Sequence, residues 1–233
     1  MGGAYELAGG TPWAEPLSTW TSLAFVLAGA AIVHGALRRE ARATRSPRLA
    51  LGVLVALVGI GSVVQHGPSP SWNAVVHDPP LLGVLALVTA DALADLTGRR
   101  LRTWWWLVPA LADVVLAAAG GPASTLAQAL AAAVAVVAGA VRAWRRPAVR
   151  RRTVVALALL GVGSAVGTQS RPGWPLCDAD GPLGVTVQGH AAWHVLAAVA
   201  LWVLAPTLGT RRPTVQPDVR PDVRPDAAAP TPR

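Results

Sequence analysis

The sequence predicts an all-α protein, a bundle of seven transmembrane helices with its N-terminus outside the cell and its C-terminus in the cytoplasm. Composition, long apolar segments and the placement of arginine lead to this fold class. Of the 233 residues, 53% are hydrophobic and only 14% are charged. Soluble domains carry about 25% charged residues, so this chain has too few charges to cover a water-facing surface. Its single cysteine excludes a disulfide scaffold.

Seven segments are apolar enough to span a bilayer. The hydrocarbon core is about 30 Å thick, so a spanning helix needs about 20 mostly apolar residues. We expect a multi-pass protein of the cell membrane. The spans lie at roughly 17–37, 49–66, 78–97, 103–120, 123–144, 152–169 and 187–207.

Local features support each span in turn. Pro16 suits the first turn of the first helix, and the second segment is rich in Leu, Val and Gly. The third carries Asp91 and Asp95, so it is the span that hydropathy supports least. Tryptophans at 104–106 begin the fourth, where an aromatic belt is expected. The fifth is nearly all Ala and Val, which permits close helix packing. The sixth follows a run of arginines, and the seventh begins with two histidines.

The composition changes after Gly209, which divides the chain into two parts. Residues 1–209 form the predicted membrane domain. Residues 210–233 repeat the four-residue unit Pro-Asp-Val-Arg and contain too few apolar residues to bury a core. We expect this tail to be disordered in the cytoplasm.

Arginine placement sets the predicted orientation. The chain has 20 basic residues, all of them Arg, and a net charge of +8. All except Arg171 fall in the first, third and fifth loops and in the tail. Because cytoplasmic loops carry the basic excess, the tail is predicted to be cytoplasmic and the N-terminus external. The positive charge is thereby explained by topology, and we expect no nucleic-acid partner.

Four of the five histidines fall at the predicted outer ends of three helices, whereas His34 falls at the cytoplasmic side. These four are His66, His77, His190 and His194. Ionisable residues within a membrane are costly, and they mark functional sites by default. The pattern therefore predicts a site near the extracytoplasmic face.

The spacing of these histidines favours a metal ion. His190 and His194 are four residues apart, so both project from one helix face, and His66 would be the third ligand. Three protein ligands plus water is typical of catalytic zinc. Simple hydrogen bonding, haem ligation, and His77 in place of His66 are the alternatives. Ser62, one turn before His66, and Asp78 could orient a zinc-bound water and accept its proton.

Four stretches resemble the alkaline ceramidase family, which lies within a membrane hydrolase superfamily that includes the progestin and adipoQ receptors. Residues 15–25 read EPLSTWTSLAF and resemble the family's first-helix motif. Residues 61–66 read GSVVQH and resemble its Ser-x-x-x-His motif. Asp78 resembles its acidic position, and residues 188–194, QGHAAWH, resemble its closing His-x-x-x-His motif.

The resemblance implies a zinc-dependent hydrolase that cleaves the amide bond of ceramide or a related lipid amide, which would enter from the bilayer. Zinc would be held by His66, His190 and His194, and Ser62 and Asp78 would be the catalytic residues. Some family members also hold calcium on acidic residues before the first helix. Here Glu6 and Glu15 are the acidic residues in that region, so a calcium site is a weaker expectation than zinc.

A receptor or transporter with seven helices is the alternative function, with a structural metal or none. In that case Asp91, Asp95 and Asp113 would form an ion path through the membrane. Under the hydrolase prediction, Asp91 and Asp95 would instead pair with Arg99 and Arg100 near the cytoplasmic side, and Asp113 would have an internal partner.

Overall fold

The structure, a computed structural model, describes residues 13–39, 42–120, 122–170, 174 and 188–211. Glu6 and the repeats of the predicted tail lie outside these residues. Seven α-helices and one short 3-10 helix account for nearly all of the described part, which contains no strand. They are α1 (Pro16–Arg39), α2 (Arg42–His66), α3 (Asn73–Thr97), α4 (Trp104–Ala118), α5 (Pro122–Arg145), α6 (Pro147–Gln169), α7 (Gly189–Leu204) and η1 (Ala205–Thr207).

The all-helical prediction is confirmed. Six of the helices are long and apolar enough to cross a membrane, and α4 is a shorter apolar helix. With 15 residues, α4 is about 22 Å long, which is less than the hydrocarbon thickness of about 30 Å. Many large apolar side chains face outward, among them Leu27, Val115, Leu130 and Val137, each at least 60% exposed. Such a surface suits lipid rather than water.

Proline and glycine mark several helix ends. Proline is the first residue of α1, α5 and α6, where its missing N–H leaves no intrahelical bond unmade. Gly98 ends α3 with φ +68°, a left-handed conformation that favours glycine. The observed helix bounds lie within seven residues of the predicted spans, and the largest difference is at the start of α2.

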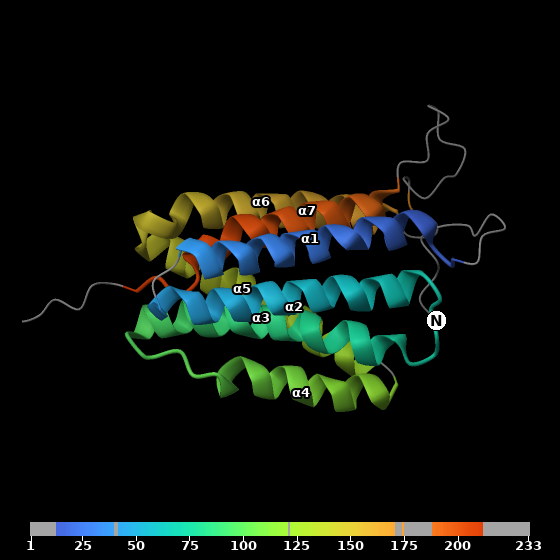
Figure 1. Ribbon diagram of the computed structural model, residues 1–233, viewed down its shortest axis with the longest axis horizontal. Coiled ribbons are helices and arrows are strands. Elements are labelled where there is room, and N and C mark those ends of the chain that lie inside the picture. The colour runs from blue at the N-terminus through green and yellow to red at the C-terminus, as the bar shows by residue number, and fades with distance from the viewer. Residues whose placement is uncertain (1–12, 40–41, 121, 171–173, 175–187, 212–233) are drawn as a thin grey trace, which may run out of the picture.

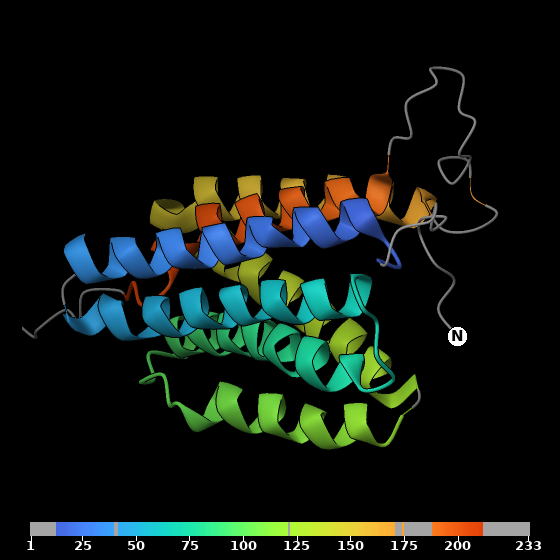
Figure 2. The ribbon, with the colours of Figure 1, turned by 45° about the vertical axis from the view of Figure 1, so that its right-hand side comes forward.

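By their packing contacts six helices form a closed ring, and α4 lies at the edge of the bundle, as Figures 1 and 2 show. Around the ring, α1 packs on α2, α2 on α3, α3 on α5, α5 on α6, α6 on α7, and α7 on α1. Helix α4 packs mainly on α3 and less on α5. It therefore covers the outer face of the α3–α5 pair.

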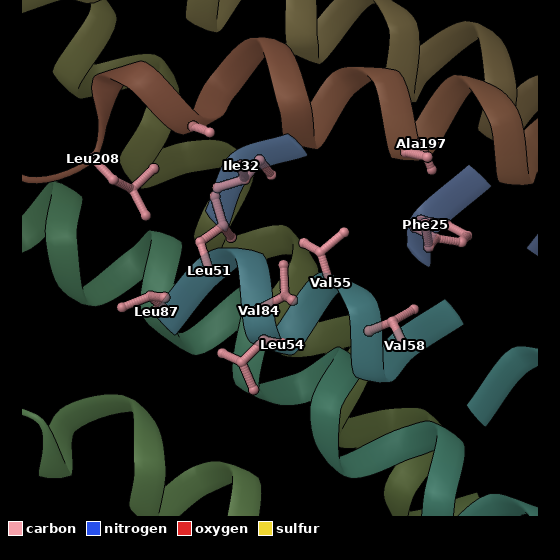
Figure 3. Close-up of a cluster of buried hydrophobic side chains, with 12 residues drawn as sticks. Phe25, Ile32, Leu51, Leu54, Val55, Val58, Val84, Leu87, Ala197 and Leu208 are labelled. Carbon is pink, nitrogen blue, oxygen red and sulfur yellow. The ribbon is translucent and has the colours of Figure 1, made fainter. Parts of the chain in front are cut away.

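The hydrophobic core lies on one side of the ring. Figure 3 shows it between α1, α2, α3 and α7, where Phe25, Leu51, Val55 and Leu87 are each at most 6% exposed. No residue of this cluster comes from α4, α5 or α6. These three helices therefore pack mostly through small side chains, whereas the α1–α2–α7 side is held by larger ones.

The two ends of the bundle differ in charge. The α1–α2, α3–α4 and α5–α6 connections lie at one end together with the residues that follow α7 (Figure 1). We name this the arginine end, after Arg48, Arg142, Arg146, Arg152 and Arg211. The opposite end, which carries His66 and His190, is the histidine end. That the arginine end faces the cytoplasm stays a prediction from charge.

Candidate functional site

Three histidines meet at the histidine end. His66 is the last residue of α2, and His190 and His194 lie on the first turns of α7. One ring nitrogen from each histidine lies within 4.8 Å of the others. The Nε2 atoms of His66 and His190 are 3.3 Å apart, and both His66 and His194 are buried. We name these three residues the histidine cluster.

Close backbone contacts hold the helices that carry this cluster. A Cβ at Gly61 would lie 2.5 Å from the Val76 carbonyl oxygen, so glycine lets α2 approach α3 five residues before His66. A Cβ at Gly189 would lie 1.9 Å from Ser170 Oγ. Glycine is therefore required where α7 begins against the end of α6, one residue before His190.

The outward-facing nitrogens of the cluster already have partners. Glu15 Oε2 lies 2.6 Å from His66 Nδ1, and the Ser18 carbonyl oxygen lies 3.1 Å from His194 Nδ1. These contacts turn the Nε2 atoms of both histidines toward the centre of the cluster. A metal-binding histidine usually donates its other N–H to a carboxylate or carbonyl in this way. The donor set, three imidazoles with such support, fits zinc.

Ser62 and Asp78 lie in different surroundings. Ser62 is 1% exposed, and its Oγ lies 2.8 Å from Ser22 Oγ. Asp78 Oδ1 lies 2.8 Å from His77 Nδ1, and Asp78 Oδ2 accepts a hydrogen bond of 2.9 Å from Ser124 Oγ. The predicted proton acceptor, Asp78, is thus bonded to α5 and to its own neighbour in the chain.

A second polar group lies between α3, α4 and α5. It consists of Asp78, Asp113, Ser124 and Gln128, which we name the carboxylate cluster. Gln128 Nε2 donates a hydrogen bond of 3.1 Å to Ser124 Oγ. Asp113 lies close enough to Asp78 for their charges to interact. Asp113 is 0% exposed and, with Ala110 and Ala117, forms the buried face of α4.

Asp113 differs from every other buried carboxylate in the described residues. Ser124 and Gln128 lie near it, but neither of its carboxylate oxygens has a hydrogen-bond partner of good geometry in the described part of the chain. A buried ionised carboxylate without a partner is strongly unfavourable. Asp113 therefore needs a proton, a cation or water at its oxygens.

Helix α3 carries two prolines directly after the aspartate of the carboxylate cluster. Pro79 and Pro80 follow Asp78 directly within α3. Because proline has no N–H, the carbonyl oxygens of Val75 and Val76 lose their usual donors four residues ahead. The Val76 carbonyl oxygen faces α2, where a Cβ at Gly61 would lie 2.5 Å from it.

Buried charges also meet at the arginine end. Arg142 donates to Asp91 Oδ2 at 2.9 Å and to Asp95 Oδ2 at 2.8 Å. Arg146 pairs with Asp95, and Arg211 lies 2.9 Å from Asp91 Oδ1. We name these five residues the arginine cluster. The prediction that Arg99 and Arg100 are the partners of Asp91 and Asp95 is wrong, since α5, the α5–α6 connection and the residues after α7 supply them.

Sequence reasoning missed several of these partners. Glu15 was considered for calcium, and its contact with His66 joins residues 51 positions apart. The sequence signal for this contact was a glutamate directly before Pro16, at the predicted outer end of a span. Ser124 and Gln128 gave no signal, because single polar residues in an Ala-rich helix are common. Arg142 was counted only as a loop charge, although it lies within α5 and is 4% exposed.

Comparison with known proteins gives one partial similarity. No family model matches the chain. Over 116 residues the chain is 39% identical to "Na(+)/H(+) antiporter NhaA 1" of Kineococcus radiotolerans, a match that covers 49% of this chain and 24% of that protein. With the six long apolar helices, the similarity supports an integral, multi-pass membrane protein.

The comparison contradicts the prediction of a zinc-dependent hydrolase of ceramide or a related lipid amide. The relative is an antiporter, so the similarity fits the alternative prediction of a transporter better. The descriptions hydrolase and ceramidase are therefore wrong for this chain. The resemblance of its motifs to the alkaline ceramidase family stays a prediction. It concerns the positions of His66, His190 and His194, and no enzymatic activity is inferred from it.

Proposed function

We propose that the chain is a membrane transporter that exchanges a monovalent cation for protons. The observation that carries the proposal is Asp113, a carboxylate that is 0% exposed on an apolar helix. Ser124 and Gln128 lie near it, but neither of its oxygens has a hydrogen-bond partner of good geometry within the described residues. The partial similarity to a Na+/H+ antiporter supports the same class.

The chemistry of the carboxylate cluster suits a small hard cation. Such ions prefer carboxylate, hydroxyl and carbonyl oxygens. Asp113 and Asp78 supply carboxylates and Ser124 a hydroxyl. No single part of the chain could supply this set, because α3, α4 and α5 each contribute.

Exchange follows from competition for one buried carboxylate. With a proton bound, Asp113 is neutral and compatible with its apolar helix. With a cation bound, the ion neutralises the charge. Burial disfavours ionised Asp113 when neither a proton nor a cation is bound to it. A transporter of the cation alone, or of the proton alone, would have to pass through that form. Asp113 therefore couples release of the cation to uptake of a proton.

Asp78 and Asp113 have distinct roles in this scheme. Asp78 is already bonded to His77 and Ser124, so its charge is largely retained for the cation. Asp113 is the group that alternates between proton and cation. Asp91 and Asp95 take no part, because the arginine cluster occupies their oxygens.

Proton movement in proteoliposomes tests the proposal. Vesicles with a proton gradient and a trapped pH dye are given Na+, Li+ or K+ in turn, and at least one ion should drive proton exit through the native protein. Asp113→Asn should lower the rate by more than about tenfold, and Asp113→Glu should retain part of it. Thr97→Ala, which alters an exposed residue at the other end of α3, is the control. If no cation moves protons above the rate of protein-free vesicles, the proposal is wrong.

We also propose that the histidine cluster binds one zinc ion, which ties the end of α2 to the start of α7. The three ring nitrogens within 4.8 Å of one another support this. Metal analysis of purified protein should find about one zinc per chain, and His190→Ala or His194→Ala should remove most of it. His34→Ala, an exposed histidine at the arginine end, should leave zinc unchanged. Full retention of zinc by the double variant would overturn the assignment.

A further inference from the structure

Gln128 is a half-buried polar residue of α5, and it lies one turn after Ser124 on the same helix face. Its Nε2 donates a hydrogen bond of 3.1 Å to Ser124 Oγ. Ser124 Oγ in turn donates a hydrogen bond of 2.9 Å to Asp78 Oδ2. Gln128 also lies near Asp78 and Asp113, which come from α3 and α4. One amide side chain therefore stands beside two carboxylates from two other helices.

The amide of Gln128 adds a neutral oxygen to the carboxylate cluster. An amide group carries two N–H donors on its nitrogen and an oxygen that accepts through two lone pairs. The hydrogen bond to Ser124 uses one N–H and does not involve the amide oxygen, Oε1. Ser124 both accepts from Gln128 and donates to Asp78, so its hydroxyl proton points at a carboxylate. The amide oxygen can therefore turn to a cation while the N–H keeps the side chain in place.

The charge of the carboxylate cluster favours a small monovalent cation. The attraction between a cation and a carboxylate rises as the distance between them falls. Two carboxylates, Asp78 and the fully buried Asp113, therefore favour Na+ or Li+ over the larger K+. Divalent sites combine several carboxylates, and the charge of their ligands tunes the affinity. A neutral ligand at Gln128 completes the oxygens around a monovalent ion without adding the charge that a divalent ion requires.

We propose that Gln128 determines the ion specificity of this site, with its amide oxygen as a direct ligand to Na+ or Li+. This role rests on the proposed function, in which the carboxylate cluster is the cation site. Its structural basis is the hydrogen-bonded chain from Gln128 through Ser124 to Asp78, together with the buried carboxylate of Asp113 on α4. A residue that only held Ser124 in place would, when removed, weaken the binding of all cations equally. A direct ligand instead changes the preference among cations.

Equilibrium binding of radioactive Na+ to the purified protein in detergent tests this role. The measurement is made at alkaline pH, where protons compete least for Asp113, with Li+ and K+ as competitors. The native protein should bind Na+, and Li+ should displace it at lower concentrations than K+. Gln128→Leu removes the amide and keeps a side chain of similar size, so Na+ affinity should fall by about tenfold. The preference over K+ should narrow as well, because a site with one fixed oxygen fewer discriminates less by ion size. Gln169→Leu is the matched control, since Gln169 ends α6 at the same end of the bundle and lies outside the carboxylate cluster.

A second variant tests the charge argument. Gln128→Glu keeps the length of the side chain and adds a third carboxylate, so Ca²⁺ should displace Na+ at a lower concentration than it does in the native protein. Unchanged Na+ affinity and ion preference in Gln128→Leu would overturn the proposal, as would a native protein that binds neither Na+ nor Li+.

The binding and vesicle measurements together separate this role from ion exchange. Proton exit by the native protein, with unchanged binding in Gln128→Leu, would overturn the ligand role and leave exchange standing. Na+ binding that Gln128→Leu weakens, without proton exit for any cation, would support the ligand role and overturn exchange.

Discussion

Asp91 at the arginine end and Asp113 near the histidine end are both 0% exposed, yet their surroundings are opposite. Asp91 accepts from Arg142, from Arg211 and from the Gly209 amide. Asp113 has only Ser124 and Gln128 near it, and neither of its oxygens has a hydrogen-bond partner of good geometry within the described residues. Equal burial therefore does not mean an equal role, and the partners decide it.

The difference between Asp91 and Asp113 distinguishes the arginine cluster, which has a structural role, from the carboxylate cluster, which could bind an ion. In the arginine cluster, Arg142 also donates to the Thr207 and Thr210 carbonyl oxygens, so it joins α3, α5 and the residues after α7. Its charges are used in holding these segments together. Removal of one partner from a buried pair leaves an uncompensated charge. In the carboxylate cluster, no described residue offers Asp113 an ion pair or a hydrogen bond of good geometry, and under the proposed function its oxygens would bind the substrate ion.

Arg142→Gln should have the largest effect on stability. It leaves Asp91 and Asp95 buried with fewer opposite charges, a change that typically costs about 3–5 kcal/mol. Unfolding in detergent, followed by thermal or denaturant titration, measures it. Arg145→Gln on the same helix is the control, because Arg145 is exposed and surface charges contribute about 0–1 kcal/mol. Equal losses in the two variants would contradict the structural role of the arginine cluster.

Glu15→Ala should have an intermediate effect, on zinc rather than on folding alone. It removes the carboxylate 2.6 Å from His66 Nδ1, and loss of such a supporting group typically lowers metal affinity by about 10–100-fold. Glu15→Gln, which still accepts a hydrogen bond, should retain more affinity. Competition with a chelating dye measures both. Unchanged affinity in Glu15→Ala would show that this contact does not position His66.

Asp113→Asn should have the smallest effect on stability and the opposite sign to Arg142→Gln. It removes a buried ionisable group that has no partner within the described residues, so stability should stay within about 1 kcal/mol or rise. The same unfolding measurement compares the two variants directly. A loss as large as that of Arg142→Gln would show that Asp113 is a structural residue and would remove the basis for its role in exchange.

The fold class could be predicted from local information. Runs of about 20 apolar residues, prolines at helix starts and arginine-rich connections are properties of single segments. They predicted seven helices, and the observed bounds, such as Asn73–Thr97 against 78–97, differ by a few residues. The histidine pair on α7 is local as well, because the spacing of His190 and His194 places both on one helix face.

Which side chains pair across two helices depends on which helix faces pack together. No single segment of the sequence determines that packing. Arg142 finds Asp91 and Asp95 because α5 packs on α3 inside the ring. Arg99 and Arg100 are nearer in the chain, but they follow the glycine that ends α3. Asp113 has no hydrogen-bond partner of good geometry in the described part of the chain, and its helix α4 lies outside the ring and buries only one narrow face. Apolar helices in lipid have many packings of similar energy, since lipid tails are as apolar as the helices. Close contacts such as Gly61 against Val76 then select one packing, and that selection determines which buried charges are paired.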